Sequence, residues 1–374
     1  MIKNLIIFGT RPEAIKMAPL VKEFVKHNEV FETRVCVTAQ HREMLDQVLS
    51  FFEIIPDYDL DLMKPNQNLY SLTSDIILGL KSVLEEFNPD YVYVHGDTTT
   101  TMAASIASFY SEAKVCHVEA GLRTNNKYSP FPEEMNRQIT GRIADYHFAP
   151  TEQSKQNLLV ENVLDDSILI TGNTVIDALL ESTVKVNSIE NPEIEKLKSI
   201  VDKSKKLILV TGHRRENHGQ GFINICEALK EIAVSHTDVQ IIYPVHLNPN
   251  VKAPVYEILS GIGAVQLIKP LAYPAFVWLM DQSYLIITDS GGVQEEAPSL
   301  GKPVLVMRDT TERPEAVDAG TVILVGTDKN RIVKECNDLL VNTERYEKMS
   351  ALHNPYGDGN ACKRIVEHII SLNK

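Results

Sequence analysis

Short β-branched apolar runs alternate along the chain with longer segments whose apolar residues recur at helical spacing. β-Branched runs are typical of strands, and apolar residues three and four positions apart are typical of helices. Because the two alternate throughout, the pattern predicts βαβ units and parallel sheets. In the first half we expect strands at 5–8, 34–38, 91–95, 115–118, 146–148 and 168–170. In the second half we expect strands at 207–211, 239–245, 265–268, 284–288, 303–307 and 321–325.

Residues 181–206 are charged and weakly patterned, and they interrupt the alternation near the middle of the chain. We therefore expect a helix and a linker there, between two α/β domains that are Rossmann-like, doubly wound and built on parallel sheets. The predicted domains are 1–172 and 173–359, with the helical segment 360–374 crossing back to the first. Open parallel sheets bind ligands beyond the carboxyl ends of their strands, so two facing sheets predict a central cleft.

Composition and charge narrow the classes of function. The chain has 374 residues and a formal net charge of −13, which disfavours non-specific binding to nucleic acid or anionic membranes. No stretch approaches the roughly 18 apolar residues of a membrane span, and the first residues lack the features of a signal peptide. The five cysteines form no CxxC pair, which indicates buried thiols in a reducing compartment. We expect a soluble, cytoplasmic enzyme.

Polar side chains gather where the strands of the first half end. The first strand ends in FGTRPE, and Arg11 with the nearby Lys16 could meet a phosphate at a helix N-terminus. A helix that starts at proline and carries solvated charges explains this segment equally well. Asp97 follows a buried strand and precedes a threonine run, so it is either a site carboxylate or a helix N-cap. Glu119 interrupts an apolar strand end just before a glycine turn and is harder to explain structurally.

The loop at 128–132 delivers Glu133 and Glu134 to a helix start, where compensation of the helix dipole is the structural alternative. Carboxylates from successive strand ends suit acid–base chemistry at a carbon centre. The chain has no GxGxxG and no P-loop motif, so dinucleotide binding and P-loop hydrolysis lose their main support. It also lacks HExxH, DxD and a cysteine cluster, and we expect neither a metal nor a cofactor.

The first strand end of the second half carries the segment TGHRREN. His213 and the two following arginines suit the binding or protonation of a phosphate leaving group. Solvated charges at a helix start are the alternative. His246 ends the next strand and could equally be a satisfied interior histidine.

The segment TDSGGVQEE carries the strongest local signal. The backbone amides of Ser290, Gly291 and Gly292 would form an anion-binding nest between a strand and a helix. Glu296 follows one turn later, where it could accept hydrogen bonds from a ribose diol. Two arginines in RDTTERPE follow the next strand and can reach the same diphosphate. A plain strand–turn–helix would not need both glycines and two acids.

Ten stretches match one known family in order along nearly the whole chain. They are FGTRPEAIKMAPL, VTAQHREMLDQVL, VHGDTTTT, HVEAGLRT, YSPFPEEMNRQ, ITGNTVIDALL, TGHRREN, YPVHLNPNV, TDSGGVQEEAPSLGKPVLVMRDTTERPEA and HNPYGDG. Together they resemble the bacterial non-hydrolysing UDP-N-acetylglucosamine 2-epimerases. The resemblance implies the two-domain architecture of the GT-B-like type.

The resemblance also implies roles for individual residues. The implied catalytic residues are Asp97, Glu119, Glu133 and His213. The implied contacts to UDP are Arg11, Lys16, His213, Ser290, Gly291, Gly292, Glu296 and Arg313, with Phe276 near the uracil. Leu271 stands where some members contact the uracil with a glutamine. Gln40, Arg214 and His246 match an activating second UDP-N-acetylglucosamine site of some members, whereas Glu43 and Asn66 depart from it.

The implied reaction is reversible inversion at C2 of the sugar, which supplies N-acetylmannosamine for surface polysaccharides. UDP leaves C1 by anti elimination to give 2-acetamidoglucal and then re-adds to give UDP-N-acetylmannosamine. The implied partners are these nucleotide sugars, UDP and a second copy of the chain in a homodimer. Three alternatives remain open: a hydrolysing epimerase that releases free N-acetylmannosamine and UDP, a GT-B glycosyltransferase, and a non-catalytic nucleotide-sugar sensor.

Overall fold

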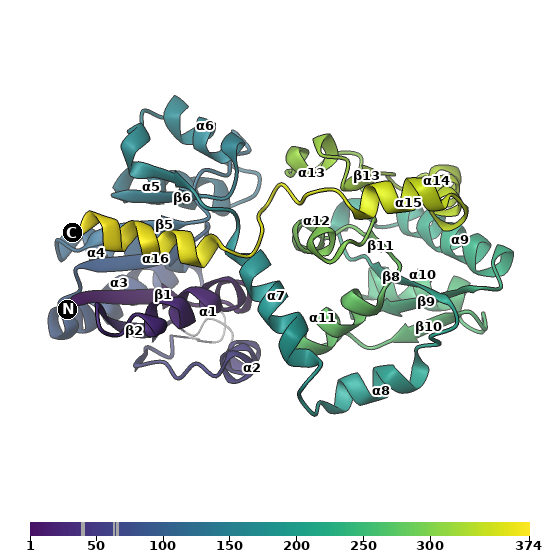
Figure 1. Ribbon diagram of the computed structural model, residues 1–374, viewed down its shortest axis with the longest axis horizontal. Coiled ribbons are helices and arrows are strands. Elements are labelled where there is room, and N and C mark those ends of the chain that lie inside the picture. Colours follow the sequence, from purple (N-terminus) through teal and green to yellow (C-terminus); the bar gives the residue numbers. More distant parts are fainter. Residues whose placement is uncertain (39–41, 63, 65–66) are drawn as a thin grey trace. The chain divides into compact units, whose positions relative to one another are not determined.

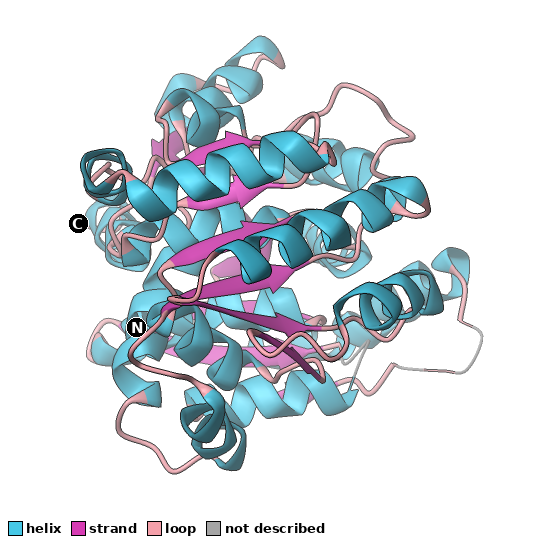
Figure 2. Ribbon diagram, turned by 90° about the vertical axis from the view of Figure 1, so that its right-hand side faces the viewer, coloured by secondary structure: helices cyan, strands magenta, loops and turns pink. Residues whose placement is uncertain are grey.

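The computed structural model describes the chain except for residues 39–41, 63 and 65–66 (Figure 1). The chain forms two compact units: Met1–Ala178 together with Tyr356–Lys374 make unit 1, and Leu179–Pro355 make unit 2. The hydropathy pattern places the boundaries after residue 172 and before residue 360. The strands lie in the interior and helices surround them (Figure 2).

Unit 1 is built on a sheet with the strand order β3-β2-β1-β4-β5-β6-β7, in which every pairing is parallel. Its strands are β1 (Ile2–Phe8), β2 (Phe31–Val37), β3 (Tyr58–Asp59), β4 (Tyr91–His95), β5 (Lys114–Val118), β6 (Tyr146–Ala149) and β7 (Ile168–Ile170). Its helices are α1 (Arg11–Lys26), α2 (Arg42–Phe52), α3 (Leu69–Phe87), α4 (Thr99–Tyr110), α5 (Glu133–Ile143), α6 (Glu152–Val160) and α16 (Ala361–Leu372). The strand order reverses between β1 and β4, which makes this pair the topological switch point.

Helices cover the sheet of unit 1, which explains why its central strands are apolar on both faces. Helices α3 and α4 pack together, and their buried side chains join those of β1 and β4 in one core. The C-terminal helix α16 packs against α1, which lies near the other end of the chain. Helix α7 (Thr174–Val186) then leads out of unit 1.

Unit 2 has the strand order β10-β9-β8-β11-β12-β13, again with parallel pairings throughout. Its strands are β8 (Lys206–Thr211), β9 (Val239–Pro244), β10 (Val265–Ile268), β11 (Leu285–Thr288), β12 (Val304–Val306) and β13 (Val322–Leu324). Its helices are α8 (Pro192–Ile200), α9 (Gln220–Ser235), α10 (Pro249–Leu259), α11 (Tyr273–Gln282), α12 (Gly291–Glu296), α13 (Pro314–Asp318), α14 (Lys329–Val341) and α15 (Thr343–Ser350). The switch point of this sheet lies between β8 and β11.

The strands predicted from the hydropathy pattern are all present, with ends that differ by a few residues. The charged stretch 181–206 contains the end of α7 and the helix α8. All five cysteines are buried, as predicted, and none of them forms a disulfide. In the described part of the chain, no helix combines the length and the apolar character that crossing a membrane requires.

Candidate functional sites

A buried carboxylate joins the turns that follow β1 and β4. Glu13 is only 2% exposed and accepts hydrogen bonds from the backbone N–H of Gly9 (3.1 Å) and of Thr10 (2.8 Å). Its other oxygen accepts from the Thr98 hydroxyl at 2.6 Å. Thr10 caps α1 in return, so a capping box starts this helix. The turn thereby holds Arg11, the first residue of α1, at the carboxyl edge of the sheet.

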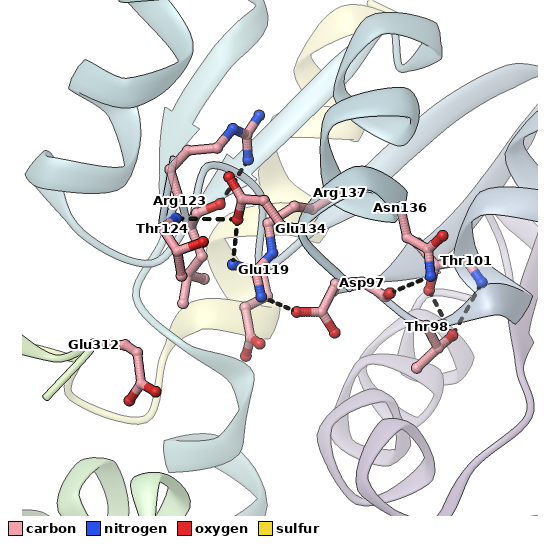
Figure 3. Close-up of polar contacts among 12 residues, drawn as sticks. Asp97, Thr98, Thr101, Glu119, Arg123, Thr124, Glu134, Asn136, Arg137 and Glu312 are labelled. Atoms are coloured by element: carbon pink, nitrogen blue, oxygen red, sulfur yellow. Dashed lines mark hydrogen bonds and ion pairs between the residues drawn. The ribbon is translucent and has the colours of Figure 1, made fainter. Parts of the chain in front are cut away.

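Asp97 lies between β4 and α4, beside the switch point of unit 1. Thr98, not Asp97, caps α4, since its hydroxyl accepts the Thr101 N–H at 3.1 Å. The interpretation of Asp97 as an N-cap is therefore wrong. Its carboxylate instead forms an ion pair with Arg137 of α5, and its carbonyl accepts from the Asn136 amide at 2.9 Å (Figure 3). About a third of the Asp97 side chain (32%) stays exposed, so a ligand can reach it.

Two neighbouring glutamates at the start of α5 have different surroundings. Glu134 is fully buried and accepts hydrogen bonds from the backbone N–H of Thr124 (3.0 Å) and Asn125 (3.1 Å) and from Arg137 (3.0 Å) (Figure 3). Burial alone raises the pKa of Glu134, but these donors outweigh it and the net pKa is lowered. Glu134 thus stays charged and holds the arginine that binds Asp97. Glu133, the predicted catalytic residue, begins the helix and is partly exposed.

Glu119 follows β5 in a left-handed backbone conformation, with a φ of 60°. Its Oε2 atom forms an ion pair with Lys16 of α1, accepts from the Asn173 amide at 3.0 Å and lies 3.4 Å from His95 Nε2. Burial raises the pKa of this carboxyl, but the charge of Lys16 and the contact with His95 lower it further, to well below its ordinary value. Glu119 is therefore held as a carboxylate although it is largely buried.

These contacts assemble one site at the switch point of unit 1. Arg11 and Lys16 come from the helix after β1, Asp97 follows β4, and Glu119 follows β5. Open parallel sheets bind ligands at this position. Lys16, which the sequence associates with a phosphate, is engaged with the carboxylate of Glu119. The arrangement offers two anionic carboxylates beside cationic groups, which suits proton transfer.

In unit 2, the turn after β8 is fixed by a carboxylate that follows β11. Asp289 is fully buried, and one of its oxygens accepts the backbone N–H of His213 and of Arg214, both at 2.8 Å. Its other oxygen lies 3.6 Å from His213 Nδ1. The His213 ring stacks on that of His246, with 5.5 Å between centroids. Burial lowers the pKa of His213 more than the charge of Asp289 raises it. The imidazole therefore stays neutral down to a lower pH than that of an ordinary histidine.

The Ser-Gly-Gly segment begins α12, next to an arginine. A Cβ atom on Gly291 would lie 2.6 Å from the guanidinium carbon of Arg313, so only glycine allows this approach. Arg313 Nε donates to the buried Glu295 at 2.7 Å. The Ser290 N–H, which the sequence assigns to the nest, donates to Thr288 Oγ1 at 3.0 Å. The Gly291 backbone and the Arg313 guanidinium thus form one positively polarised surface.

The second arginine of RDTTERPE has different surroundings. Arg308 is buried, and its guanidinium donates to Glu216 (2.8 Å) and to Glu312 (2.6 Å). Burial raises the pKa of Glu312, but the hydrogen bond and charge of Arg308, a backbone hydrogen bond and the charge of Arg313 together outweigh it and lower this pKa to about 2. Arg308 therefore stabilises the loop before Arg313, whereas the sequence associates it directly with the diphosphate.

Several of the remaining predicted residues lie in unit 2. Phe276 is on α11 and partly buried, and Leu271 lies just before this helix. Arg214 Nη1 lies 3.9 Å from Glu312 Oε1. Gln40 and Asn66 fall outside the described residues. Within the described residues, no three His, Cys, Asp or Glu side chains are grouped so that they could hold a metal ion.

Three residues that organise these sites are not predicted by the sequence pattern. Arg137 binds Asp97, Asn173 binds Glu119, and Asp289 holds the turn of His213. The two residues of these pairs are 40, 54 and 76 positions apart in the sequence, respectively. A local sequence pattern does not predict contacts over such separations. The available signal is that all three lie inside the stretches that carry the family resemblance.

Comparison with known proteins identifies the family. The family model described as UDP-N-acetylglucosamine 2-epimerase matches residues 23–370. The chain belongs to this family. It is 62% identical to the UDP-N-acetylglucosamine 2-epimerase of Escherichia coli K12 over 367 residues, which cover 98% of this chain and 97% of the relative.

Solved structures of relatives agree with this assignment. The crystal structure of UDP-GlcNAc 2-epimerase from Neisseria meningitidis bound to UDP-GlcNAc is 55% identical, with a TM-score of 0.89 over 99% of this chain and 100% of that one. The Methanocaldococcus jannaschii UDP-GlcNAc 2-epimerase in complex with UDP-GlcNAc and UDP is 33% identical, with a TM-score of 0.79 over 99% of this chain and 100% of that one. The predicted fold class, two Rossmann-like domains of the GT-B-like type, is confirmed.

Proposed function

We propose that this chain interconverts UDP-N-acetylglucosamine and UDP-N-acetylmannosamine without hydrolysis. Membership of the epimerase family supports the substrate and the carbon that reacts. One structural observation carries the acid–base part of the proposal. Two carboxylates, Asp97 and Glu119, follow the neighbouring strands β4 and β5 beside the switch point, and each is paired with a buried or half-buried cation. The proposed use of the product is to supply N-acetylmannosamine for surface polysaccharides.

The proposed reaction runs through an unsaturated sugar. A carboxylate takes the proton from C2, the electron pair of the C2–H bond forms the C1=C2 double bond, and the C1–O bond breaks with its pair leaving on UDP. The intermediate is 2-acetamidoglucal. In the second half, a carboxylic acid protonates C2 on the opposite face and a diphosphate oxygen of UDP adds to C1.

Proton transfer at C2 is assigned to the carboxylates of unit 1. Glu119 is held anionic at neutral pH by Lys16 and His95, and Asp97 is oriented by Arg137. A base must be deprotonated and fixed within reach of its proton, and these ion pairs meet both needs. Glu133 is the third proposed member, on the partly exposed first turn of α5.

Stabilisation of the leaving diphosphate is assigned mainly to unit 2. The Gly291 and Gly292 amides, the Arg313 guanidinium and His213 supply donors for the charge that develops on UDP. The family resemblance adds Glu296 for the ribose, Phe276 for the uracil, and Ser290, Arg11 and Lys16 as further contacts. A second copy of the chain and an activating nucleotide sugar near Arg214 and His246 are also proposed on this resemblance.

An isotope experiment tests the reaction. The purified protein is incubated with UDP-N-acetylglucosamine in deuterated water, and the sugar is followed by NMR. We expect UDP-N-acetylmannosamine with deuterium at C2, and at equilibrium the UDP should still be attached to the sugar. Free N-acetylmannosamine and UDP would identify a hydrolysing epimerase. Absence of turnover would favour a sensor or a transferase that needs an acceptor.

Single substitutions test the assigned residues. Asp97→Asn, Glu119→Gln and His213→Asn should each reduce turnover by about 100-fold or more while the thermal unfolding temperature stays within a few degrees. Glu85→Gln and Asp166→Asn are matched controls, since both side chains are exposed on the surface of unit 1 and should retain full activity. Near-normal turnover in any of the first three variants would remove that residue from the mechanism.

A further inference from the structure

Asn173 directly precedes α7, the helix through which the chain leaves unit 1, and contacts the segment by which the chain re-enters it. Its backbone N–H donates to the carbonyl of Tyr356, the first residue of the returning segment, at 2.7 Å. Gly172 packs against Gly357 so closely that a Cβ on Gly172 would lie 3.2 Å from the Gly357 Cα. Figure 1 shows the segment that leads into α16 passing the start of α7. Both connections between the units therefore meet at this residue.

The side chain of Asn173 has two different functions in the structure. Its Oδ1 atom accepts the Val175 N–H at 3.0 Å, as a residue that caps a helix start does. Its Nδ2 atom donates to Glu119 Oε2 at 3.0 Å. A helix cap needs only the oxygen, and serine or aspartate would supply one. The amide nitrogen is an additional feature, and it is directed at a proposed catalytic carboxylate.

We infer that Asn173 is a positioning residue that fixes the orientation of Glu119 and ties it to the two segments connecting the units. The inference rests on the proposed function, in which Glu119 transfers a proton at C2. Asn173 is only 3% exposed, so its hydrogen bond does not compete with bulk water. The direction of the Glu119 carboxylate then depends on the backbone at residues 172–174 and 356–357.

The other groups around Glu119 do not replace this contact. Lys16 from α1 and His95 from β4 face the same oxygen, Oε2, and supply charge. A lysine ammonium is a point charge on a flexible stem and fixes direction poorly. Asn173 supplies a neutral donor from a backbone that is itself held by Tyr356. Without this donor, Glu119 should remain in place, but the orientation of its carboxylate should be less well fixed and its pKa should rise.

The substitution Asn173→Ser tests the inference, because serine can still cap α7 but cannot reach Glu119. We expect kcat to fall about tenfold or more, with a smaller change in KM, because misalignment of a proton-transfer group acts on the chemical step. The acidic limb of the pH profile of kcat/KM should move to higher pH. Asn191→Ser is the matched control, since Asn191 caps α8 with the same kind of contacts and lies in unit 2.

A second variant, Asn173→Asp, should shift the acidic limb of the pH profile further than Asn173→Ser does. Asn173→Asp also keeps a capping oxygen, but it places a negative charge beside Glu119, so its acidic limb should move further than that of the serine variant. Thermal unfolding of all three variants should stay close to that of the unchanged protein. If Asn173→Ser and Asn173→Asp both keep the kcat and the pH profile of the unchanged protein, Asn173 is only a helix cap and the inference is wrong.

A double substitution separates this inference from the proposed function. If Asn173 acts through Glu119, adding Asn173→Ser to Glu119→Gln should lower the remaining activity by less than twofold, because coupled residues are not additive. Full activity of Glu119→Gln alone would overturn the proposed role of Glu119. A strong effect of Glu119→Gln with independent, multiplying effects in the double variant would overturn the inference about Asn173 only.

Discussion

At the scale of single residues, Arg137 links a structural carboxylate to a functional one. Its guanidinium donates to the buried Glu134 and forms an ion pair with the partly exposed Asp97 (Figure 3). An arginine can hold two carboxylates at once because its donors form a rigid planar fork. Asp97 is therefore oriented by a residue that the Glu134 carboxylate has itself fixed in place.

Replacing this arginine by lysine should separate charge from geometry. Arg137→Lys keeps a positive charge but cannot bind both carboxylates in the same plane, so we expect kcat to fall about tenfold or more. The loss should appear in kcat rather than in KM, measured with UDP-N-acetylglucosamine. Arg142→Lys, on the exposed face of the same helix, is the control and should leave both constants unchanged. Full activity of Arg137→Lys would show that charge alone suffices.

The sequence predicts the site residues that directly follow strands, but it does not predict the residues that bind them. Asp97, Glu119 and His213 could be proposed because each follows an apolar strand, and the carboxyl ends of parallel strands share one edge. Their partners Asn173 and Asp289 could not be assigned, because those contacts depend on which strands become neighbours. The local pattern also does not distinguish Glu133 from Glu134, which differ in what their side chains contact; only the family resemblance singles out Glu133.

At the scale of elements, the regular strands were predictable and the shortest one was not. Strands such as β8 are continuous apolar runs because helices cover both faces of the sheet, and this pattern is visible in the sequence. Strand β3 consists only of Tyr58 and Asp59 and joins the edge of the sheet through β2. Two residues carry no periodicity, and their pairing depends on the neighbouring strand being present.

The start of α12 offers a test of how the proposed diphosphate site is built. Gly291→Ala should displace the Arg313 guanidinium, because the new Cβ would lie 2.6 Å from its central carbon. We expect about tenfold weaker binding of UDP, measured by calorimetry, since a charge-assisted hydrogen bond contributes on the order of 1.5–3 kcal/mol. Gly263→Ala is the control, because a Cβ there would meet no atom within 4 Å. Unchanged UDP affinity in Gly291→Ala would exclude Arg313 from the site.

At the scale of the whole molecule, two buried histidines should make stability depend on pH. Burial lowers the pKa of His117 to about 3 and that of His147 to about 4, from an ordinary value of 6.5. Protons therefore bind preferentially to the unfolded chain, so this contribution to the free energy of unfolding is complete above pH 6.5 and decreases below it. At pH 5 the contribution of each histidine to the free energy of unfolding should be smaller by about 2 kcal/mol.

Calorimetric unfolding between pH 7 and pH 5 measures this effect. In His147→Gln, the unfolding temperature should fall less steeply with acid than in the unchanged protein, whatever its value at pH 7. His353→Gln removes an exposed histidine and should leave the slope as it is. An equal slope in His147→Gln and in the unchanged protein would show that this histidine is not the titrating group.

The discontinuity of unit 1 has a consequence for biosynthesis. Unit 2 is one continuous stretch, so a ribosome releases all of it before residues 356–374, which complete unit 1. Helix α16, whose buried face includes Ile365, Val366 and Ile369, packs on α1 only after that release. Domains generally fold in the order in which they emerge, but here the half begun first is finished last. The nascent chain must therefore carry an uncovered apolar surface on α1 until α16 has emerged from the ribosome, the stage at which a chaperone would have most to protect.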